Sequence, residues 1–501
     1  MHSSDFMTIT ELFTRAGLED CLSSHLSTVN AEVSHVAYDS REIKSGAVFV
    51  AIKGIKNDGL NYVGEAFDRG AVAIVSEAPR PRISNVPWIE VSNVRQILAK
   101  LSATFYGDPS QKLLIVGTTG TNGKTTTTYL IEQVLESAGM SCGRISSVTH
   151  RVSNQEQDAI HTTPESNDLQ RLLREMVDHK CNACAMEVSS HALALSRVEA
   201  VKFSAVAFTN LTRDHLDFHG DMSSYFSVKK RLFKMIDEEV PAVINVDDPY
   251  GKQLISDVNS PVTYGINTSA DVMPLQMELS SAGIELNVKT PRGPLQISSN
   301  LLGQGNTYNI LATIALGSSL GIPFPAIRKG IMGVKSVPGR MQVVSSEKDP
   351  VKVLVDFAHT DDALRSLLET ARKLTNGRLI TVFGCGGDRD TSKRPLMGAV
   401  AGRLSDLVIL TSDNPRSEDP GYITKEVERG LSACSIPWLI ILSRSEAIQQ
   451  SIQEAKHGDL VVIAGKGHER HQIIGEKFMP FDDASVAREA LALRRAGVRA
   501  G

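Results

Sequence analysis

The sequence predicts an α/β protein of three domains, and three observations support this prediction. Continuous apolar runs alternate along the chain with segments of helical period, for example LLIVG followed by TTTTYLIEQVLESAG. Such runs are typical of parallel strands that helices cover on both faces. The 501 residues suffice for about three domains of roughly 100–200 residues each. Polar joints at 107–112 (GDPSQK) and 335–340 (KSVPGR) each precede a new series of strands.

These joints place the three domains. We expect a smaller α/β domain over 1–111, a central domain over 112–337 and a C-terminal domain over 338–501. The central domain should contain a parallel sheet of the P-loop ATPase type, and the C-terminal domain should be Rossmann-like. Residues 273–301 alternate with a period of two and turn at Gly and Pro, which predicts an antiparallel excursion inside the central domain.

The composition excludes several classes of protein. The chain has 53 Lys and Arg against 57 Asp and Glu, a net charge of −4, which provides no long-range field for nucleic acid or an anionic membrane. No window reaches the roughly 18 apolar residues of a membrane span, and the first residues do not form a signal peptide, so we expect a cytoplasmic protein. The six cysteines are too few for a disulfide scaffold, and Cys181 and Cys184 lack a second pair for zinc, so buried free thiols are expected.

Residues 113–135 carry the strongest local signal: a strand, a glycine-rich turn, Lys-Thr and then a helix. Gly120 and Gly123 would let backbone N–H groups approach phosphate oxygens at a helix N-terminus. Lys124 would neutralise the β- and γ-phosphates, and the Thr125 hydroxyl could bind Mg²⁺. The motif departs from the strict G-x4-GK[ST] pattern, because Thr stands where its first glycine would be. The alternative, a turn that only joins a strand to a helix, leaves Gly-Lys-Thr unexplained.

Ligand-type residues for a metal follow two further predicted strands. Glu187 lies at the end of the apolar strand in CAMEVSSHAL, and His215 lies after the strand in VAFTNLTRDHLDFHG. The carboxyl ends of strands are where open α/β sheets gather their sites. Lys229 lies on an amphipathic helix in YFSVKKRLF. The residues alone leave open that His215 is a surface histidine and that Lys229 is a solvated surface charge.

Eleven motifs follow one another in an order and at a spacing that resemble the Mur ligase family, from Asp39 to about Glu469. They are GTTGTNGKTTT, HTTPES, MEVSSHAL, NLTRDHLDFHG, YFSVKKRLF, GQGNTYN, VPGRM, DFAHTDDAL, GCGGDRD, DNPRSEDP and AGKGHE. Such an ordered set is far more specific than a P-loop alone.

The resemblance implies an ATP-dependent acid–amino-acid ligase of peptidoglycan precursor synthesis. Within the family, the motifs are most similar to those of members that add meso-2,6-diaminopimelate to the D-Glu γ-carboxylate of UDP-N-acetylmuramoyl-L-Ala-D-Glu through an acyl phosphate. The implied cofactors are ATP, two Mg²⁺ ions and CO2 bound as a lysine carbamate. The two substrates are the expected partners, without nucleic acid or membrane insertion, and a monomer is expected. Domain 1–111 would bind the UDP-sugar, 112–337 would bind ATP and 338–501 would bind the amino acid.

The resemblance also implies the metal site. Lys229, as a carbamate, would hold the second Mg²⁺ together with Glu187 and His215, whereas Thr125 would hold the first ion beside the phosphates. Lys230 is the alternative register for the carbamate. The implied catalytic residues are Lys124, Lys229, Glu187 and His215.

The implied nucleotide site has a phosphate part and an adenine part. Asn306 and Asn309 would contact adenine, and they can share one helix face because they are three residues apart, with helix capping as the alternative. Arg340 and His359 would complete the site. DFAHTDDAL departs from the usual DYAHTPDAL, and Asp361 in place of proline is expected to loosen that turn. The phosphate residues are Gly120, Thr121, Asn122, Gly123, Lys124, Thr125 and Thr126.

The UDP-sugar substrate would contact both of the first two domains. Ser40 and the stretch 55–57 are implied for uridine. His161 and Leu195 stand where related sequences often carry Asn and Gln, which leaves details of the peptide contacts open. The residues implied for the muramoyl-peptide and its D-Glu carboxylates are Thr162, Thr163, Ser189 and Arg197.

The implied amino-acid site follows from the chemistry of diaminopimelate. Its distal carboxylate suits the guanidinium of Arg416 or Arg389, and its distal ammonium suits Glu469. Lysine-adding relatives lack the Arg of this motif, because a bare ammonium would leave that charge unpaired. The alternative is that DNPRSEDP forms only an Asx or proline turn. The implied residues are Arg389, Asp413, Asn414, Pro415, Arg416, Gly465 and Glu469.

Other functions fit the motifs less well. Arg416 disfavours a Mur ligase that adds lysine or a tripeptide. A folylpolyglutamate synthase would share the P-loop and the carbamylated lysine, but its P-loop lies near the chain start, whereas the glycine-rich turn here begins at Gly117. A P-loop GTPase that acts as a binding module needs an N-K-x-D motif, which this sequence lacks.

Overall fold

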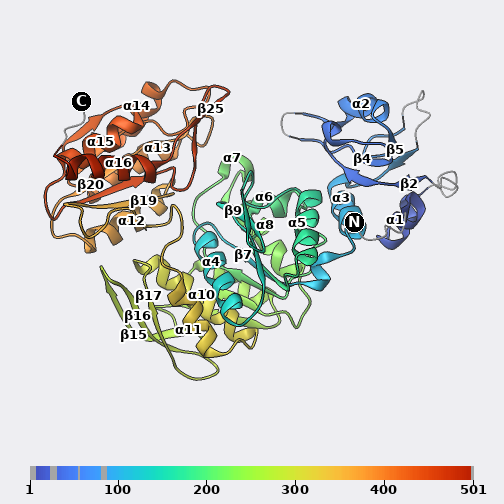
Figure 1. The fold of residues 1–501 in the computed structure, drawn as a ribbon, viewed down its shortest axis with the longest axis horizontal. Coiled ribbons are helices and arrows are strands. Elements are labelled where there is room, and N and C mark those ends of the chain that lie inside the picture. Colours follow the sequence, from blue (N-terminus) through green and yellow to red (C-terminus); the bar gives the residue numbers. More distant parts are fainter. Residues whose placement is uncertain (1–6, 23–30, 55–56, 81–86, 498–501) are drawn as a thin grey trace. The chain divides into compact units, whose positions relative to one another are not determined.

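The computed structural model describes residues 7–22, 31–54, 57–80 and 87–497 (Figure 1). Their contacts form two compact units. The first takes the residues up to Thr119 together with Met140–Val206 and Val228–Val240, and the second takes Gly120–Gly139, Ala207–Ser227 and the residues from Pro241 onward.

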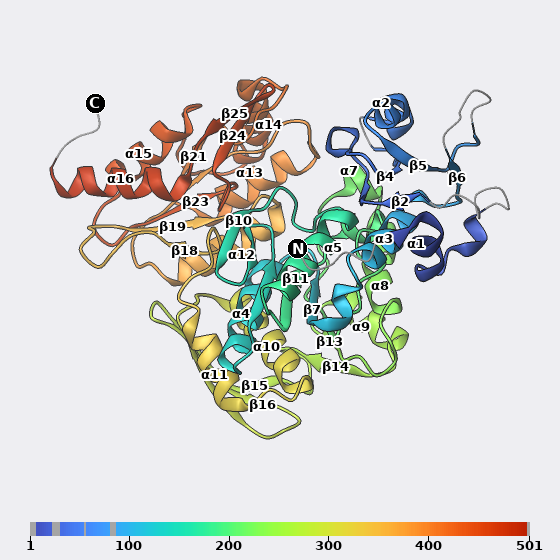
Figure 2. The same ribbon diagram turned by 45° about the vertical axis from the view of Figure 1, so that its right-hand side comes forward.

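A parallel four-stranded sheet lies near the start of the chain. Its strands follow the order β3 (His35–Ala37), β4 (Ala47–Val50), β5 (Ala71–Ser76) and β6 (Trp88–Glu90). Val48 and Val50 belong to one hydrophobic core and Phe49 to another, so the sheet is covered on both faces. Figure 2 shows α2 on one side of this sheet and α1 and α3 on the other. The remaining elements here are β1 (Met7–Thr8), α1 (Ile9–Arg15), η1 (Glu19–Cys21), β2 (Glu32–Val33), η2 (Ser40–Glu42), η3 (Gly59–Tyr62), α2 (Val63–Asp68), α3 (Val94–Phe105) and η4 (Pro109–Lys112).

A second sheet contains the strand that leads into the glycine-rich turn. Its strands follow the order β10 (Gln155–Asp158), β9 (Thr149–Val152), β8 (Cys142–Ile145), β11 (Ala183–Glu187), β7 (Leu114–Thr119), β12 (Ala205–Phe208), β13 (Ala242–Asn245) and β14 (Pro261–Tyr264). Strand β11 pairs in parallel with both β7 and β8, and all five of its residues are buried. Glu187 pairs with Thr118, so the two strands end at the same edge. The sheet therefore brings the end of β11 beside the start of the glycine-rich turn.

Helices and a small antiparallel sheet complete the middle of the chain. The helices are α4 (Lys124–Ser137), α5 (Ser166–Asp178), α6 (Ser190–Ala194), α7 (Leu216–His219), α8 (Met222–Lys234), α9 (Pro249–Leu254), η5 (Ile255–Asp257), α10 (Gln304–Ser319) and α11 (Phe324–Gly333). The strands β15 (Met273–Ser280), β16 (Gly283–Lys289) and β17 (Leu295–Ser299) pair antiparallel, which confirms the excursion predicted over 273–301.

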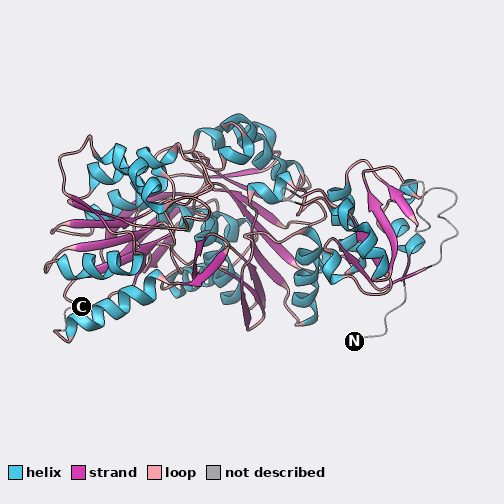
Figure 3. Cartoon of the chain, turned by 90° about the horizontal axis from the view of Figure 1, so that it is seen from above, coloured by secondary structure: helices cyan, strands magenta, loops and turns pink. Residues whose placement is uncertain are grey.

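The C-terminal part contains a sheet whose strands are parallel except at one edge. The order is β18 (Gln342–Val343), β19 (Lys352–Asp356), β23 (Leu460–Ala464), β20 (Leu379–Phe383), β21 (Leu407–Leu410) and β22 (Trp438–Ile440), with β18 antiparallel. Helices cover both faces (Figure 3), and a hydrophobic core lies on each. The other elements are α12 (Asp361–Lys373), α13 (Lys393–Leu404), α14 (Pro420–Leu431), α15 (Arg444–Glu454), β24 (His471–Ile474), β25 (Lys477–Pro480) and α16 (Asp483–Arg495).

These sheets confirm the predicted α/β class, while the boundaries at 111/112 and 337/338 stay predictions. Within the described ranges, no helix is long and apolar enough to cross a membrane. All six cysteines are free thiols, as predicted, but Cys21 and Cys434 are only partly buried. The prediction of burial is wrong for these two: Cys21 packs against the edge of a core, and Cys434 follows the end of α14.

The buried His150 on β9 predicts a pH dependence of stability. Burial, with the charge of Arg144, lowers the pKa of His150 from 6.5 to about 4. The unfolded chain therefore binds a proton that the folded chain rejects between these pH values, and acidification from pH 6.5 to 4 should lower the free energy of unfolding by about 3 kcal/mol. His150→Gln should flatten the fall of Tm across this window, measured by circular dichroism. His457→Gln, at an exposed position, is the control, and an unchanged profile in His150→Gln would contradict the assignment.

Candidate active site

The glycine-rich turn leaves the N-terminus of α4 open. Gly120 and Gly123 have φ values of +146° and +90°, which side chains of L-residues rarely permit. A Cβ atom would lie 1.8 Å from Thr209 Oγ1 at Gly120 and 2.4 Å from Asn309 Oδ1 at Gly123. Gly123 is the N-cap of the helix, and no side chain caps it. Uncapped N–H groups at the positive end of a helix dipole form a site for an anion such as phosphate.

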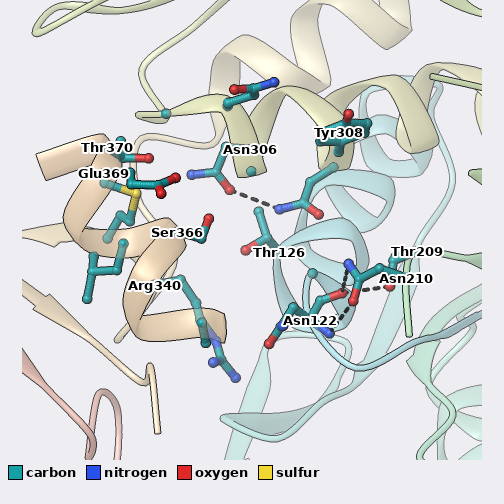
Figure 4. Close-up of a pocket in the computed structure, with 18 of the residues that line it drawn as sticks. Asn122, Thr126, Thr209, Asn210, Asn306, Tyr308, Arg340, Ser366, Glu369 and Thr370 are labelled. Carbon is teal, nitrogen blue, oxygen red and sulfur yellow. Dashed lines mark hydrogen bonds between the residues drawn. The ribbon is translucent and has the colours of Figure 1, made fainter. Parts of the chain in front are cut away.

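The loop that follows β12, with Thr209 and Asn210, holds the backbone of this turn (Figure 4). The Asn122 N–H donates to Asn210 Oδ1 (2.9 Å), and Asn210 Nδ2 donates to the Asn122 carbonyl oxygen (3.1 Å). Thr209 Oγ1 donates to the same carbonyl at 2.6 Å. Thr209 and Asn210 were not predicted as site residues, although they lie in the FTNLTRDHLD motif. Their contacts hold the turn in place through the backbone of Asn122.

Two cations converge on the turn. Lys124 Nζ donates to the carbonyl oxygens of Gly120 (3.0 Å) and Thr121 (2.8 Å). Arg340 Nη2 donates to Thr125 Oγ1 at 3.0 Å, so a residue far along the chain reaches the first turn of α4, as predicted. The positive charges add to the helix dipole and favour a polyanionic ligand.

A cavity of about 480 Å³ adjoins the turn (Figure 4). Six of the residues predicted for the nucleotide line it, namely Asn122, Gly123, Thr126, Asn306, Asn309 and Arg340. Gly120, Thr121, Lys124, Thr125 and His359 do not appear in its lining, although the first four belong to the adjoining turn. Ser366, Glu369 and Thr370 of α12 form another wall.

Asn306 and Asn309 share one face of α10, as their spacing predicts. Asn309 Nδ2 donates to Asn306 Oδ1 (3.0 Å), and Asn306 Nδ2 donates to the Leu302 carbonyl (2.8 Å). The N-cap of α10 is Gly303, which has no side-chain cap. Both amides line the cavity, and the assignment to adenine stays a prediction.

Asp247 and Tyr308 line the same cavity and were not predicted. Backbone N–H groups of Ile266, Asn267 and Thr268 donate to the Asp247 carboxylate, as does the Tyr308 hydroxyl at 2.9 Å. Burial alone would raise the pKa of Asp247, but these hydrogen bonds outweigh it and lower the pKa to about 2. An anion is therefore fixed in the cavity wall. An Asp after a strand resembles an ordinary turn residue, so the sequence gives no signal for it.

Asp214 connects two of the predicted histidines in the second unit. Its Oδ2 lies 3.4 Å from His215 Nε2 and 3.7 Å from His359 Nε2. Burial would raise the pKa of Asp214, but the hydrogen bond and charge of His359 hold it well below its usual range. Asp361 accepts from Arg213 Nη2 at 2.9 Å, and Thr360 caps α12. The turn at Asp361 thus has a cap and an ion pair, and the looser turn expected relative to proline stays a prediction.

The other predicted metal ligands lie in the first unit. Glu187 Oε1 accepts from the Ser147 N–H at 2.8 Å, and Glu187 is 1% exposed. Lys229 on α8 is also 1% exposed, whereas Lys230 is partly exposed, which favours Lys229 of the two registers. Among the described residues, no three His, Cys, Asp or Glu side chains are grouped as metal ligands. The metal site stays a prediction.

Three of the residues predicted for the muramoyl-peptide lie together. Thr163 Oγ1 contacts Ser189 Oγ at 3.3 Å, and Arg197 Nη1 donates to the Thr163 carbonyl at 2.9 Å. Thr162 precedes them on the same loop and is partly exposed. Glu165, which was not predicted, lies 3.4 Å from Arg197.

The residues predicted for uridine lie in the first part of the chain. The buried Ser40 Oγ donates to Glu65 Oε2 at 3.0 Å. Residues 55 and 56 of the predicted stretch 55–57 lie outside the described residues. The uridine contacts stay predictions.

Arg389 and Arg416 lie around Gly386 in the C-terminal part. A Cβ atom at Gly386 would lie 3.0 Å from Arg416 Nη1 and 4.0 Å from Arg389 Cγ. Arg416 donates to the Gly387 carbonyl (2.7 Å) and Arg389 to the Asp388 carbonyl (3.0 Å). Neither guanidinium forms an ion pair with any residue in the described ranges, and burial, with the charge of Arg389, lowers the pKa of Arg416. Two arginines around the same glycine, without a salt-bridge partner among the described residues, suit a carboxylate ligand.

The remaining residues predicted to bind the incoming amino acid form a connected group. Together with Arg389 and Arg416 they are called the acceptor group below. Asn414 Nδ2 donates to Glu469 Oε2 (2.8 Å), and a Cβ atom at Gly465 would lie 2.7 Å from Asp413 Oδ2. Pro415 joins Asn414 to Arg416 and is buried. The group includes a residue that was not predicted, Lys466, although it lies in the AGKGHE motif.

Lys466 is fully buried between two of the acceptor residues. Its Nζ donates to Asn414 Oδ1 (3.0 Å) and to Glu469 Oε2 (2.8 Å). Burial would raise the pKa of Glu469, but the charge of Lys466 lowers it, so Glu469 stays an anion. Glu469, which is predicted to bind the distal ammonium of the substrate, thus already pairs with the ammonium of Lys466.

Comparison with known proteins gives three domain matches and close relatives along the chain. The Mur ligase family catalytic domain matches residues 32–106, the Mur ligase middle domain matches 118–317 and the Mur ligase glutamate ligase domain matches 339–467. A relative from Alkaliphilus metalliredigens named UDP-N-acetylmuramoyl-L-alanyl-D-glutamate--2,6-diaminopimelate ligase is 44% identical, over 91% of this chain and 93% of its own. The chain belongs to the Mur ligase family.

Further relatives agree with this membership. A protein of the same name from Gloeobacter violaceus is 44% identical, over 98% of this chain and 99% of its own. A solved structure titled with that name is 30% identical, with a TM-score of 0.69 over 98% of this chain and 99% of that one. The fold also resembles MurF ligase from Thermotoga maritima in complex with ADP, at 20% identity and a TM-score of 0.62 over 91% and 96% of the two chains. Mur ligases use ATP and Mg²⁺.

The close packing around Gly123, in the glycine-rich turn at the start of α4, predicts that a side chain at this position weakens ATP binding. Gly123→Ala would place a methyl group 2.4 Å from Asn309 Oδ1 at a φ of +90°. We expect ATP affinity to fall by about tenfold or more, since the N–H groups of the turn must move. The measurement is a titration with a fluorescent ATP analogue.

Gly139→Ala is the matched control. Gly139 follows the other end of α4 with nearly the same φ, +88°, and nothing lies within 4 Å of the added carbon. The control should keep its ATP affinity. Equal affinity losses in both variants would mean that backbone strain, and not the close packing around Gly123, causes the effect.

Proposed function

We propose that this Mur ligase joins meso-2,6-diaminopimelate to the D-Glu γ-carboxylate of UDP-N-acetylmuramoyl-L-Ala-D-Glu, while ATP is converted to ADP and phosphate. The names of the relatives from A. metalliredigens and G. violaceus supply the substrate pair. The observation on this chain that supports the proposal is the pair Arg389 and Arg416, whose hydrogen bonds go to the backbone carbonyls of Asp388 and Gly387. The two arginines form no salt bridge among the described residues, although the charges of Asp388, Asp413 and Glu469 act on Arg416. The product would be a precursor of peptidoglycan.

The first half of the reaction would take place at the glycine-rich turn. The γ-carboxylate attacks the γ-phosphorus of ATP, the bond to the ADP oxygen breaks, and an acyl phosphate forms. The open N-terminus of α4 and Lys124 would bind the phosphates, and Arg340 would bring a second cation. Mg²⁺, when bound, spreads the negative charge of the transfer, and Thr125 Oγ1 is the oxygen of this turn that would hold it.

The second half would use the acceptor group in the C-terminal part. The amine of diaminopimelate attacks the acyl carbon, a tetrahedral intermediate forms, and the amide remains when phosphate leaves. The reaction needs no protein nucleophile, so the side chains act by positioning and electrostatics. Thr163, Ser189 and Arg197 would hold the D-Glu portion whose γ-carboxylate reacts.

The charges of the acceptor group support diaminopimelate over lysine. A distal carboxylate would pair with Arg416 and Arg389, and a distal ammonium would approach Glu469. Lysine brings only the ammonium and would leave the partly buried Arg416 without a carboxylate from the substrate. Such an unpaired charge disfavours the wrong substrate more strongly than a lost apolar contact does.

Product formation tests this proposal directly. The purified protein with ATP, Mg²⁺ and UDP-N-acetylmuramoyl-L-Ala-D-Glu should release phosphate and yield the amide, by mass spectrometry, with meso-diaminopimelate and not with L-lysine. Arg416→Met should lower kcat/KM for diaminopimelate by about a hundredfold, since it removes a charged hydrogen-bond donor. Arg488→Met, at an exposed position, is the control. Amide formation with lysine alone would refute the specificity.

The proposal includes Lys229 as a carbamate that would hold a second Mg²⁺ together with Glu187 and His215. Support comes from burial, because a lysine that is 1% exposed is unusual for a solvated surface charge. A carbamate turns this lysine into an oxygen ligand of the kind that Mg²⁺ prefers.

Isotope labelling tests the carbamate. Protein equilibrated with ¹³C-bicarbonate should show one carbamate resonance by ¹³C NMR, and Lys229→Arg should abolish it, because the guanidinium does not form a carbamate under these conditions. Lys230→Arg is the matched control and should keep the resonance. Loss of the signal in Lys230→Arg alone would move the carbamate to the other register.

The proposal further places a monomeric enzyme in the cytoplasm, with residues 1–111 for the UDP-sugar, 112–337 for ATP and 338–501 for the amino acid. Sedimentation equilibrium of the full chain measures the oligomeric state, and a dimer would refute that part alone.

A further inference from the structure

A fully buried cation lies behind the two acceptor arginines. Arg394 on α13 is 0% exposed, yet neither the sequence motifs nor the proposed reaction assigns it a role. It lies between the loop after β20, which carries Arg389, and the loop after β21, which carries Arg416. Burying a guanidinium is costly unless its donors are paired. Both terminal nitrogens of Arg394 are paired, whereas its Nε–H has no hydrogen-bond partner among the described residues.

Arg394 ties the two loops together through Glu418. Arg394 Nη1 and Nη2 donate to the two carboxylate oxygens of Glu418 at 2.9 and 2.8 Å, which is the bidentate geometry of a strong ion pair. Arg394 Nη2 also donates to the Gly386 carbonyl at 3.1 Å. Glu418 Oε1 in turn accepts from the Asp388 N–H at 2.5 Å. The ion pair thus bonds to the backbone of the first loop at Gly386 and Asp388, and Glu418 is itself part of the second loop.

Further hydrogen bonds connect the two loops that carry Arg389 and Arg416. The Gly387 N–H donates to the Asn414 carbonyl at 2.9 Å, and Arg416 Nη1 donates to the Gly387 carbonyl at 2.7 Å. Ser417 Oγ donates to Asp388 Oδ1 at 2.6 Å. A shift of the first loop would therefore carry Arg389 with it and disturb the bond between Arg416 and Gly387, which changes the position of Arg389 relative to Arg416. The spacing of the two guanidinium groups depends on the loop that Arg394 and Glu418 hold.

We infer that Arg394 and Glu418 form a positioning pair that sets the spacing of Arg389 and Arg416, and thereby selects an acceptor with a distal carboxylate. This inference rests on the proposed function of those arginines. Arg394 and Glu418 touch no reacting atom and act through the loop backbone. The pair is a determinant of acceptor choice.

Glu418→Gln tests the inference. The amide replaces one carboxylate oxygen by a donor, so Arg394 faces a donor in either orientation of the amide, and the Asp388 N–H does so as well when the NH2 group replaces Oε1. We expect KM for diaminopimelate to rise about tenfold or more, with KM for ATP unchanged, and the preference for diaminopimelate over lysine to fall by a similar factor.

Glu426→Gln is the matched control. Glu426 on α14 also pairs with Arg394, at 2.7 Å, but has no contact with the first loop among the described residues. The control should keep the wild-type KM and preference. If Glu418→Gln keeps them too, the inference is wrong.

Hydrogen exchange separates this inference from the proposed function. In the free protein, the peptide that covers 386–389 should exchange faster in Glu418→Gln than in the wild type or in Glu426→Gln, whether or not diaminopimelate is the substrate. If the wild type makes no product with diaminopimelate, the proposed function fails, and unchanged exchange would refute the positioning role by itself. Ser417→Ala, at an exposed position, removes one further bond between the loops and should raise exchange and KM in the same direction if Glu418→Gln does not fold.

Discussion

The fixed backbone of the glycine-rich turn is the constraint on which the rest of the active site depends. Its N–H groups can bind phosphate only if other contacts hold the turn, and Thr209 and Asn210 supply these through the carbonyl and N–H of Asn122. The buried strand β7 fixes where the turn begins. The cavity, the asparagine pair of α10 and Arg340 are then arranged around this turn, which is the site proposed for the phosphates of ATP.

The two ends of the proposed reaction use different electrostatics. The phosphate end relies on backbone dipoles with Lys124 and Arg340, which suits a large anion that must also leave as ADP. The acceptor end relies on full charges, because a small amino acid offers few other contacts for discrimination. Buried cations hold these charged side chains in position. Lys466 pairs with Glu469, and Arg394 bonds to the Gly386 carbonyl in the loop that carries Arg389. In the proposed function, the choice of amino acid thus depends both on the side chains that contact it and on the buried residues that hold them.

Local motifs account for what the sequence predicts correctly. The alternation of buried runs and helices gives the parallel sheets, and the spacing of Asn306 and Asn309 gives their shared face. The sequence does not reveal Asp247, Arg394 or Glu165, because the interactions that distinguish them are made with residues distant in the chain. The partner of Asp361, Arg213, is likewise distant in the chain and is not evident from the motif.

The central claim is that the γ-carboxylate of the UDP-sugar substrate is phosphorylated before the amide forms. The most direct measurement uses substrate with ¹⁸O in both oxygens of that carboxylate and follows the mass of the phosphate released in the presence of diaminopimelate. An acyl phosphate predicts one ¹⁸O atom in each phosphate, because the carboxylate oxygen that attacked phosphorus leaves with it. Unlabelled phosphate, with amide still formed, would contradict the account.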